Sequence, residues 1–171
     1  LGGISTYVSQ ITRSLVAHGA DVEVFCGSPT RTDSFISDGV RVHRVQSDRL
    51  DFPSAVVSAF KLRHERHRFD VIEGPDYLAE AAEVVQAAPE VPYVVKLHTP
   101  YYFVFALNRE PMKFAAIRDQ FRLLWYVIKT RDASVLLSAE HRIFQAEKQN
   151  LHLADEIVAP SQAIAQTVGK K

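Results

Sequence analysis

Apolar residues recur at regular spacings along most of the chain, and the spacing alternates between helical and strand periods. Near the amino terminus, apolar positions separated by four, three and four residues predict an amphipathic helix that stops at Gly19: Ile4, Val8, Ile11 and Leu15. Two alternating runs follow at residues 22–26 and 40–45, and alternation of this kind predicts strands. Residues 27–29 are expected to form a loop, and a turn at Asp38-Gly39 precedes the second run.

The middle of the chain combines a helix, a short strand and a second helix. Ser54 is the expected N-cap of the first helix, whose inward side is predicted to carry Ala55, Ala59 and Leu62. Residues 70–73 form a predicted strand that ends at Gly74-Pro75. The segment 77–88, rich in alanine and glutamate, is predicted as a helix that ends at Pro89.

Beyond residue 100 the pattern is mainly helical. Apolar residues at three and four spacings predict a first helix around residues 114–128 and a second over 134–153, with a hinge at residues 130–132. A last short strand is predicted at residues 155–159. Ser161 is the expected N-cap of a final helix.

Residues 92–98 are predicted as a central strand of a parallel sheet. Their β-branched and aromatic run carries a single charge, Lys96, as expected for a strand buried on both faces. Thr99-Pro100 ends the strand, because proline has no N–H for the ladder. His98 therefore lies at the carboxyl end of a central strand, which is where open α/β sheets bind ligands. A structural histidine that bonds the loop backbone is the alternative.

The order of these elements indicates an α/β protein with a Rossmann-like, mostly parallel sheet and helices on both faces. The chain opens with Gly2-Gly3 directly before a helix, so the strand that normally precedes such a loop is not seen in the sequence. We expect that strand to lie between residues 22–26 and 71–73. These two segments should therefore not pair with each other. Residues 1–171 are expected to form a single domain.

Composition is that of an ordinary globular protein and excludes several functional classes. The 20 Lys and Arg balance 20 Asp and Glu, so no overall charge attracts nucleic acid. Cys26 is the single cysteine, which excludes an internal disulfide and a multi-cysteine metal site. No apolar run reaches the roughly 18 residues of a membrane span. The stretch 61–68 is locally basic, and with the aromatic residues Phe121 and Trp125 it leaves open a weak contact with anionic membranes.

Candidate chemistry is concentrated in the glycine pair and at the ends of the strands. Gly2 and Gly3 allow a ligand to approach the backbone and the first N–H groups of the helix, although a tight turn explains them equally well. No third glycine follows at Thr6, so a dinucleotide site has little support. Metal is not expected, because His64 and His67 lack the i, i+4 spacing of a zinc helix.

The loop after the strand at residues 70–73 contains polar side chains. Glu73, Asp76 and Tyr77 are placed to bond a polar ligand or to orient His98. For Asp76 the simpler interpretation is that it caps the following helix.

Five phrases of the sequence, in this order, resemble the amino-terminal half of the GT-B glycosyltransferases of family 4. They cover nearly all of the chain: LGGISTYV at residues 1–8, HGADVEVF at 18–25, DVIE at 70–73, VVKLHT at 94–99 and ADEIVAPS at 154–161. The resemblance implies one of two facing Rossmann-like domains. In that family the first domain binds the acceptor, the second binds a nucleotide-sugar, and the sugar is transferred with retention of configuration.

The resemblance also implies roles for individual residues. Gly2 and Gly3 match the loop that lies against the donor phosphates and the acceptor, and His98 matches a catalytic histidine that faces the transferred sugar. Ser161 matches a serine after the last strand, where it would also contact donor phosphate or acceptor. Contacts with the acceptor are expected from loops beyond the strands: Asp76, Tyr77, Thr99 and Tyr101.

These expectations describe the acceptor-side half of a cytoplasmic retaining glycosyltransferase, with a peripheral membrane contact left open. Its partners would be a nucleotide-sugar donor, a sugar or lipid-linked acceptor, and a carboxyl-terminal domain that this sequence lacks. No cofactor, metal or nucleic acid is expected, and the chain alone should be inactive. The alternatives are a non-catalytic Rossmann-like binding module and half of a GT-B-type sugar-nucleotide epimerase.

Overall fold

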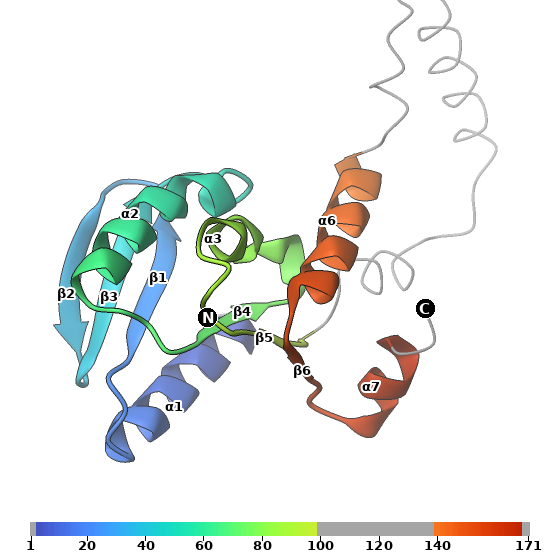
Figure 1. The fold of residues 1–171 in the computed structure, drawn as a ribbon, viewed down its shortest axis with the longest axis horizontal. Helices are drawn as coiled ribbons and strands as arrows, with labels where there is room; N and C mark the ends of the chain where they lie inside the picture. The colour runs from blue at the N-terminus through green and yellow to red at the C-terminus, as the bar shows by residue number, and fades with distance from the viewer. Residues whose placement is uncertain (1–2, 99–138, 169–171) are drawn as a thin grey trace, which may run out of the picture.

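The computed structural model of the protein describes residues 3–98 and 139–168, which form two three-stranded sheets with helices against them (Figure 1). Up to β5 the elements are α1 Gly3–Ala17, β1 Glu23–Ser28, β2 Asp33–Ser37, β3 Val40–Gln46, α2 Phe52–Arg66, β4 Ile72–Pro75, the 3-10 helix η1 Tyr77–Ala79, α3 Ala82–Ala87 and β5 Tyr93–Lys96. The later elements are α6 Ala139–Leu153, β6 Glu156–Val158 and α7 Gln162–Val168. The predicted α/β class is confirmed.

The first sheet has the order β1-β3-β2, with β1 parallel to β3 and β2 antiparallel to it. The sequence interpretation missed β2. Its signal was the Asp38-Gly39 pair, in which both residues have positive φ, 52° and 80°. A two-residue turn of this kind joins antiparallel strands. The predicted turn is therefore the tip of a β2–β3 hairpin.

The second sheet is parallel throughout, in the order β4-β5-β6. Its central strand is β5, as predicted, and Tyr93, Val95 and Leu97 on one of its sides are almost completely buried. Strands β1 and β4 do not pair within the residues that the structure describes, which confirms that part of the predicted strand order. In Figure 1, α3 and α1 lie on opposite sides of β4 and β5.

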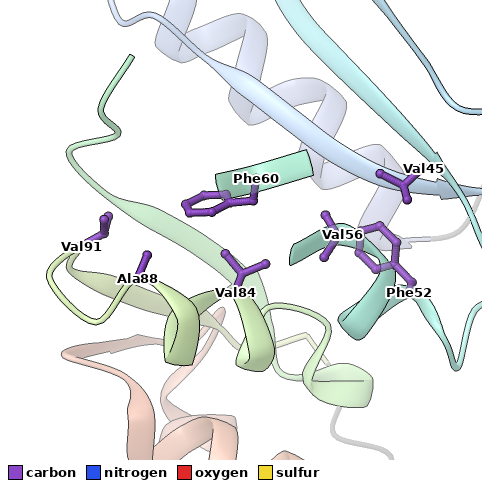
Figure 2. Packing of buried hydrophobic residues seen from close by; sticks show 7 residues of the cluster. All are labelled: Val45, Phe52, Val56, Phe60, Val84, Ala88 and Val91. Carbon is purple, nitrogen blue, oxygen red and sulfur yellow. The ribbon is translucent and has the colours of Figure 1, made fainter. Parts of the chain in front are cut away.

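Helix α2 joins the first sheet to α3 through the main hydrophobic core. Figure 2 shows its seven buried members: Val45, Phe52, Val56, Phe60, Val84, Ala88 and Val91. The predicted inward residues Ala55 and Ala59 are only partly buried against this cluster, and Leu62 is 52% exposed, so that prediction was wrong for Leu62. The inward face is instead set by three residues spaced four apart, Phe52, Val56 and Phe60.

The start of α2 also differs from the prediction. Asp51, not Ser54, is the residue before the helix, and it makes no capping hydrogen bond through its side chain. The Ser54 hydroxyl donates to the Asp51 carbonyl at 3.0 Å. Pro53 lies in the first turn, where proline is favoured because its missing N–H would have no helical partner, and this allows the helix to begin earlier.

The predicted helix at residues 77–88 is broken into η1 and α3. Leu78 has φ 59° and ψ 7°, and Ala79 has φ 52°, so both are left-handed. Two helix boundaries agree with the prediction: Gly19 follows α1 with φ 89°, and the Ser161 hydroxyl caps α7 by accepting from the Ile164 N–H at 3.3 Å. Strand β1 instead continues through Gly27 to Ser28, where a loop was expected. The predicted helix around residues 114–128 and the hinge at 130–132 lie outside the described residues. No helix in the described ranges is long and apolar enough to cross a membrane.

Candidate functional site

The carboxyl ends of β4 and β5 meet the first turns of α1, and this is where the candidate site lies. We call the cluster of Tyr7, Glu73, Asp76, Lys96 and His98 the His98 site. The Tyr7 ring packs edge-on against the His98 imidazole, with 5.0 Å between the ring centroids. Residues on three separate segments, α1, the β4 end and the β5 end, are therefore gathered around one histidine.

Tyr7 links these segments through both its hydroxyl and its ring. The hydroxyl donates to the Glu73 Oε1 at 3.0 Å, and the Lys96 Nζ lies 5.3 Å from the ring centroid, a cation–π distance. Burial and the Glu73 carboxylate raise the pKa of Tyr7 to about 12, so it remains a neutral hydrogen-bond donor. Tyr7 was not predicted as a site residue. The available signal was its position in the first turns after Gly3, next to the predicted ligand crevice.

His98 is held mainly as a neutral imidazole. Burial lowers its pKa, the Asp76 carboxylate opposes that shift, the Lys96 ammonium adds to it, and Glu73 opposes it more weakly. A neutral imidazole donates from one ring nitrogen and accepts at the other. Such a group is suited to hold a ligand hydroxyl rather than to carry charge.

Asp76 is the most buried ionisable residue of the site, with 1% of its surface exposed. Its Oδ1 accepts from the Tyr77 N–H at 2.9 Å and from the His98 N–H at 3.0 Å. Its Oδ2 is buried without a hydrogen-bond partner among the residues described. Burial raises the pKa of Asp76, and the hydrogen bonds from His98 and Tyr77 only partly offset that rise. The expected capping role is present, and the hydrogen bond from the His98 N–H agrees with the other expectation, that Asp76 orients His98.

Comparison with known proteins identifies the family. Residues 2–171 match the family described as "Glycosyl transferase 4-like domain". The chain belongs to this family. No curated protein and no solved structure shows a significant match to the chain. The predicted resemblance to family 4 glycosyltransferases is thereby confirmed.

The remaining predicted site residues of this glycosyltransferase domain are placed as follows. Gly3 begins α1, and a Cβ at this position would meet nothing within 4 Å. Tyr77 follows Asp76, with the Arg49 guanidinium 4.9 Å from its ring centroid. Ser161 lies just beyond β6, at the same edge of the parallel sheet as His98, and its hydroxyl is engaged in capping α7. Outside the described residues lie Gly2, Thr99 and Tyr101.

The domain contains a second polar cluster, remote from this edge, around Glu23. The Glu23 carboxylate, 2% exposed, binds His43 at 2.8 Å and takes a two-point contact from Arg63. The other ring nitrogen of His43 lies 2.7 Å from the Ser34 hydroxyl. This order of hydroxyl, imidazole and carboxylate resembles a hydrolase triad, but Arg63 already neutralises the carboxylate and Phe25 stacks on the imidazole with 4.6 Å between centroids. We assign this cluster a structural role.

The predicted basic stretch is partly turned inward. Arg63 belongs to the Glu23 cluster, and the His64 ring packs against the rings of Phe60 and Phe69. These two side chains are therefore not available to contact a membrane surface. In the described part of the chain no group of three or more His, Cys, Asp or Glu side chains is arranged to hold a metal ion.

Proposed function

We propose that this domain is the acceptor-side half of a retaining glycosyltransferase, which moves a sugar from a nucleotide-sugar donor to an acceptor. The observation that carries the proposal is the neutral His98 at the carboxyl end of the central strand, packed against Tyr7 of α1. In parallel α/β sheets this edge is where ligands bind. Membership of the glycosyl transferase 4-like family supports the chemistry.

The donor diphosphate would lie at the start of α1. The first N–H groups of a helix have no partner within it and carry partial positive charge, so they stabilise a leaving diphosphate. Gly2 and Gly3 would admit the phosphates, since Gly3 faces open space. Ser161 would add a contact from the end of β6. No metal is expected, and the donor is a substrate rather than a cofactor.

His98 would hold a hydroxyl of the transferred sugar, so that the acceptor attacks from the side of the leaving group. The imidazole does not need to ionise for this role, in keeping with its lowered pKa. Tyr77, Thr99 and Tyr101 would contact the acceptor. The buried Asp76 would not contact the acceptor but would hold the His98 backbone, whose N–H donates to its carboxylate. Holding the reacting groups in place is itself a large part of catalysis.

We further propose that a second, carboxyl-terminal domain completes the crevice and binds the nucleotide. Residues 1–171 alone should then show no transfer and little affinity for nucleotide-sugars. The acceptor would be a sugar or lipid-linked molecule, and the setting cytoplasmic, with a peripheral membrane contact. Sedimentation with anionic vesicles at low and high salt tests that contact.

The decisive experiment replaces His98 with alanine in the full-length protein. Turnover should fall roughly ten- to a thousandfold, because loss of one hydrogen bond to a reacting sugar costs about 1.5–4 kcal/mol. The melting temperature should be nearly unchanged. His67→Ala is the matched control, since His67 is exposed on the far end of α2.

A wild-type rate combined with a lowered melting temperature would make His98 a structural residue. Ligand binding without transfer by the full-length protein, under every donor tried, would favour a non-catalytic binding module instead.

A further inference from the structure

The turn formed by residues 74–79, from the end of β4 through η1, contains an unfavourable backbone conformation next to the His98 site. Leu78 and Ala79 are consecutive left-handed residues, and neither is glycine. L-residues with a Cβ rarely adopt this conformation, because the Cβ crowds the following carbonyl. Conformations of this kind persist only when the surrounding structure holds them, and they cluster at functional sites.

Two buried side chains of α6 hold this turn from one side. The Glu147 Oε1 accepts from the Leu78 N–H at 3.2 Å, and the Asn150 Nδ2 donates to the Pro75 carbonyl at 3.2 Å. Glu147 is 3% exposed and Asn150 is completely buried. They are three residues apart in α6 and therefore share one face of it. The Asn150 Oδ1 also accepts from the Tyr93 hydroxyl at 2.8 Å, which fixes the amide orientation.

The end of β5 holds the same turn from the other side. The Asp76 N–H donates to the Lys96 carbonyl at 3.2 Å, and the Asp76 Oδ1 accepts from the His98 N–H at 3.0 Å. The backbone on both sides of Leu97 is thus tied to Asp76. A shift of the turn would move His98 with it.

We propose that Asp76, Glu147 and Asn150 are positioning residues for His98. Glu147 and Asn150 hold the strained turn, and the turn places Asp76 where its carboxylate fixes the backbone of His98. Through this arrangement α6 sets the orientation of an imidazole on a different segment. The kinetic consequence rests on the proposed transferase function, whereas the effect on the conformation of His98 does not.

A purely stabilising role would have a different signature. Truncating a side chain that only stabilises the core changes the free energy of unfolding but leaves the surroundings of His98 intact while the protein is folded. Truncating a positioning residue changes those surroundings at temperatures where all molecules are folded. The Asp76 Oδ1 can be supplied by asparagine and the Glu147 Oε1 by glutamine, so conservative variants should restore the position.

The test records nuclear magnetic resonance spectra of the full-length protein, with the His98 signals identified by their loss in His98→Gln. Asp76→Ala and Glu147→Ala should shift or multiply the imidazole and amide signals of His98. In Asp76→Asn the amide signal of His98 should return close to its original position. In Glu147→Gln both the amide and the imidazole signals should do so. Val56→Ala, a core variant in α2, is the control and should leave them unchanged.

A second variant covers the case in which Asp76→Ala does not fold. In Tyr93→Phe combined with Asn150→Leu, both partners of one buried hydrogen bond become apolar groups of similar shape, so the remaining loss comes from the Pro75 carbonyl, which no longer has its Asn150 donor. This pair removes the tie from α6 to the Pro75 carbonyl and should also shift the His98 signals. Unchanged His98 signals in the folded variants would overturn the proposal.

The kinetic arm uses the same proteins under conditions where each is folded. Asp76→Ala and Glu147→Ala should lower kcat about ten- to a hundredfold with little change in KM, since small misplacements of a reacting group have effects of this size. Asp76→Asn and Glu147→Gln should recover most of the rate. If no transfer is detected in the unaltered protein, the proposed function fails while the spectra still decide the positioning role.

Discussion

His43 and His98 both lie near a buried carboxylate, but within the part of the chain that the structure describes the polar groups around His43 are fully paired and those around His98 are not. Both ring nitrogens of His43 have partners, and the Glu23 carboxylate beside it is also bound by Arg63. Near His98, one oxygen of Asp76 is buried without a partner among the described residues, and the adjoining turn is strained. Buried polar groups are normally paired, so the exceptions need an explanation.

The pKa values of the two carboxylates shift in opposite directions. Burial alone would raise the pKa of Glu23, but hydrogen bonds and charges from Arg63 and His43 outweigh burial and lower it. For Asp76 burial dominates, and its pKa is raised. The ionised form is therefore favoured by folding at Glu23 and disfavoured at Asp76. The ionised Glu23 carboxylate therefore contributes to stability, whereas ionisation of Asp76 costs stability.

The largest expected effect is on the Glu23 cluster. Glu23→Gln should lower the free energy of unfolding by about 3 kcal/mol, because Arg63 is left partly buried without its counter-ion. Asp76→Asn should change it by less than about 1 kcal/mol, since the asparagine oxygen still accepts from both N–H groups. Urea unfolding measures both values. Arg13→Ala, which breaks an exposed ion pair with Asp38, is the control and should be nearly neutral.

Equal losses for Glu23→Gln and Asp76→Asn would contradict this contrast, because both carboxylates would then be structural ion-pair members.

The next effect is a difference in pH dependence. Because folding lowers the pKa of Glu23, its carboxylate contributes to the free energy of unfolding above pH 4.5, the ordinary pKa of the group. This contribution is lost as the pH falls through the folded-state pKa. The raised pKa of Asp76 has the opposite sign, so stability is lost as the pH rises from 3.8 through the folded-state pKa.

Unfolding free energies measured between about pH 3 and 7 should show both pH dependences, the increase due to Glu23 and the decrease due to Asp76. Glu23→Gln should flatten the rise of stability with pH, and Asp76→Asn should gain relative to the unaltered protein as the pH increases. A gain for Asp76→Asn that shrinks with increasing pH would mean that the Asp76 carboxylate is stabilised by folding.

The smallest effect concerns the strained turn. Ala79→Gly should be neutral or stabilising by up to about 1 kcal/mol, because glycine adopts positive φ without steric cost. The same change in an ordinary helix, Ala59→Gly in α2, should cost about 1 kcal/mol. Thermal unfolding compares the two variants. A loss at Ala79 as large as that at Ala59 would show that the turn stores no strain.

Sequence alone determined the elements whose cause is local. The apolar run before Thr99-Pro100 identified β5 as the central strand and placed His98 at its end, and the glycine at position 19 marked the end of α1. The Asp38-Gly39 pair contained the information for β2 as well, although it was interpreted only as a turn. The family resemblance followed from five such local phrases.

Only the tertiary structure decided how the site is assembled. Tyr7 meets Glu73 and Asn150 meets Pro75 across gaps of 66 and 75 residues. Hydrophobic periodicity and turn chemistry report on residues within a few positions of one another, so they contain no information on such pairs. Helix propensity also favoured an unbroken helix at residues 77–88. Buried partners on α6 hold Leu78 out of it, because a tertiary hydrogen bond in the protein interior outweighs a local preference of a few tenths of a kcal/mol.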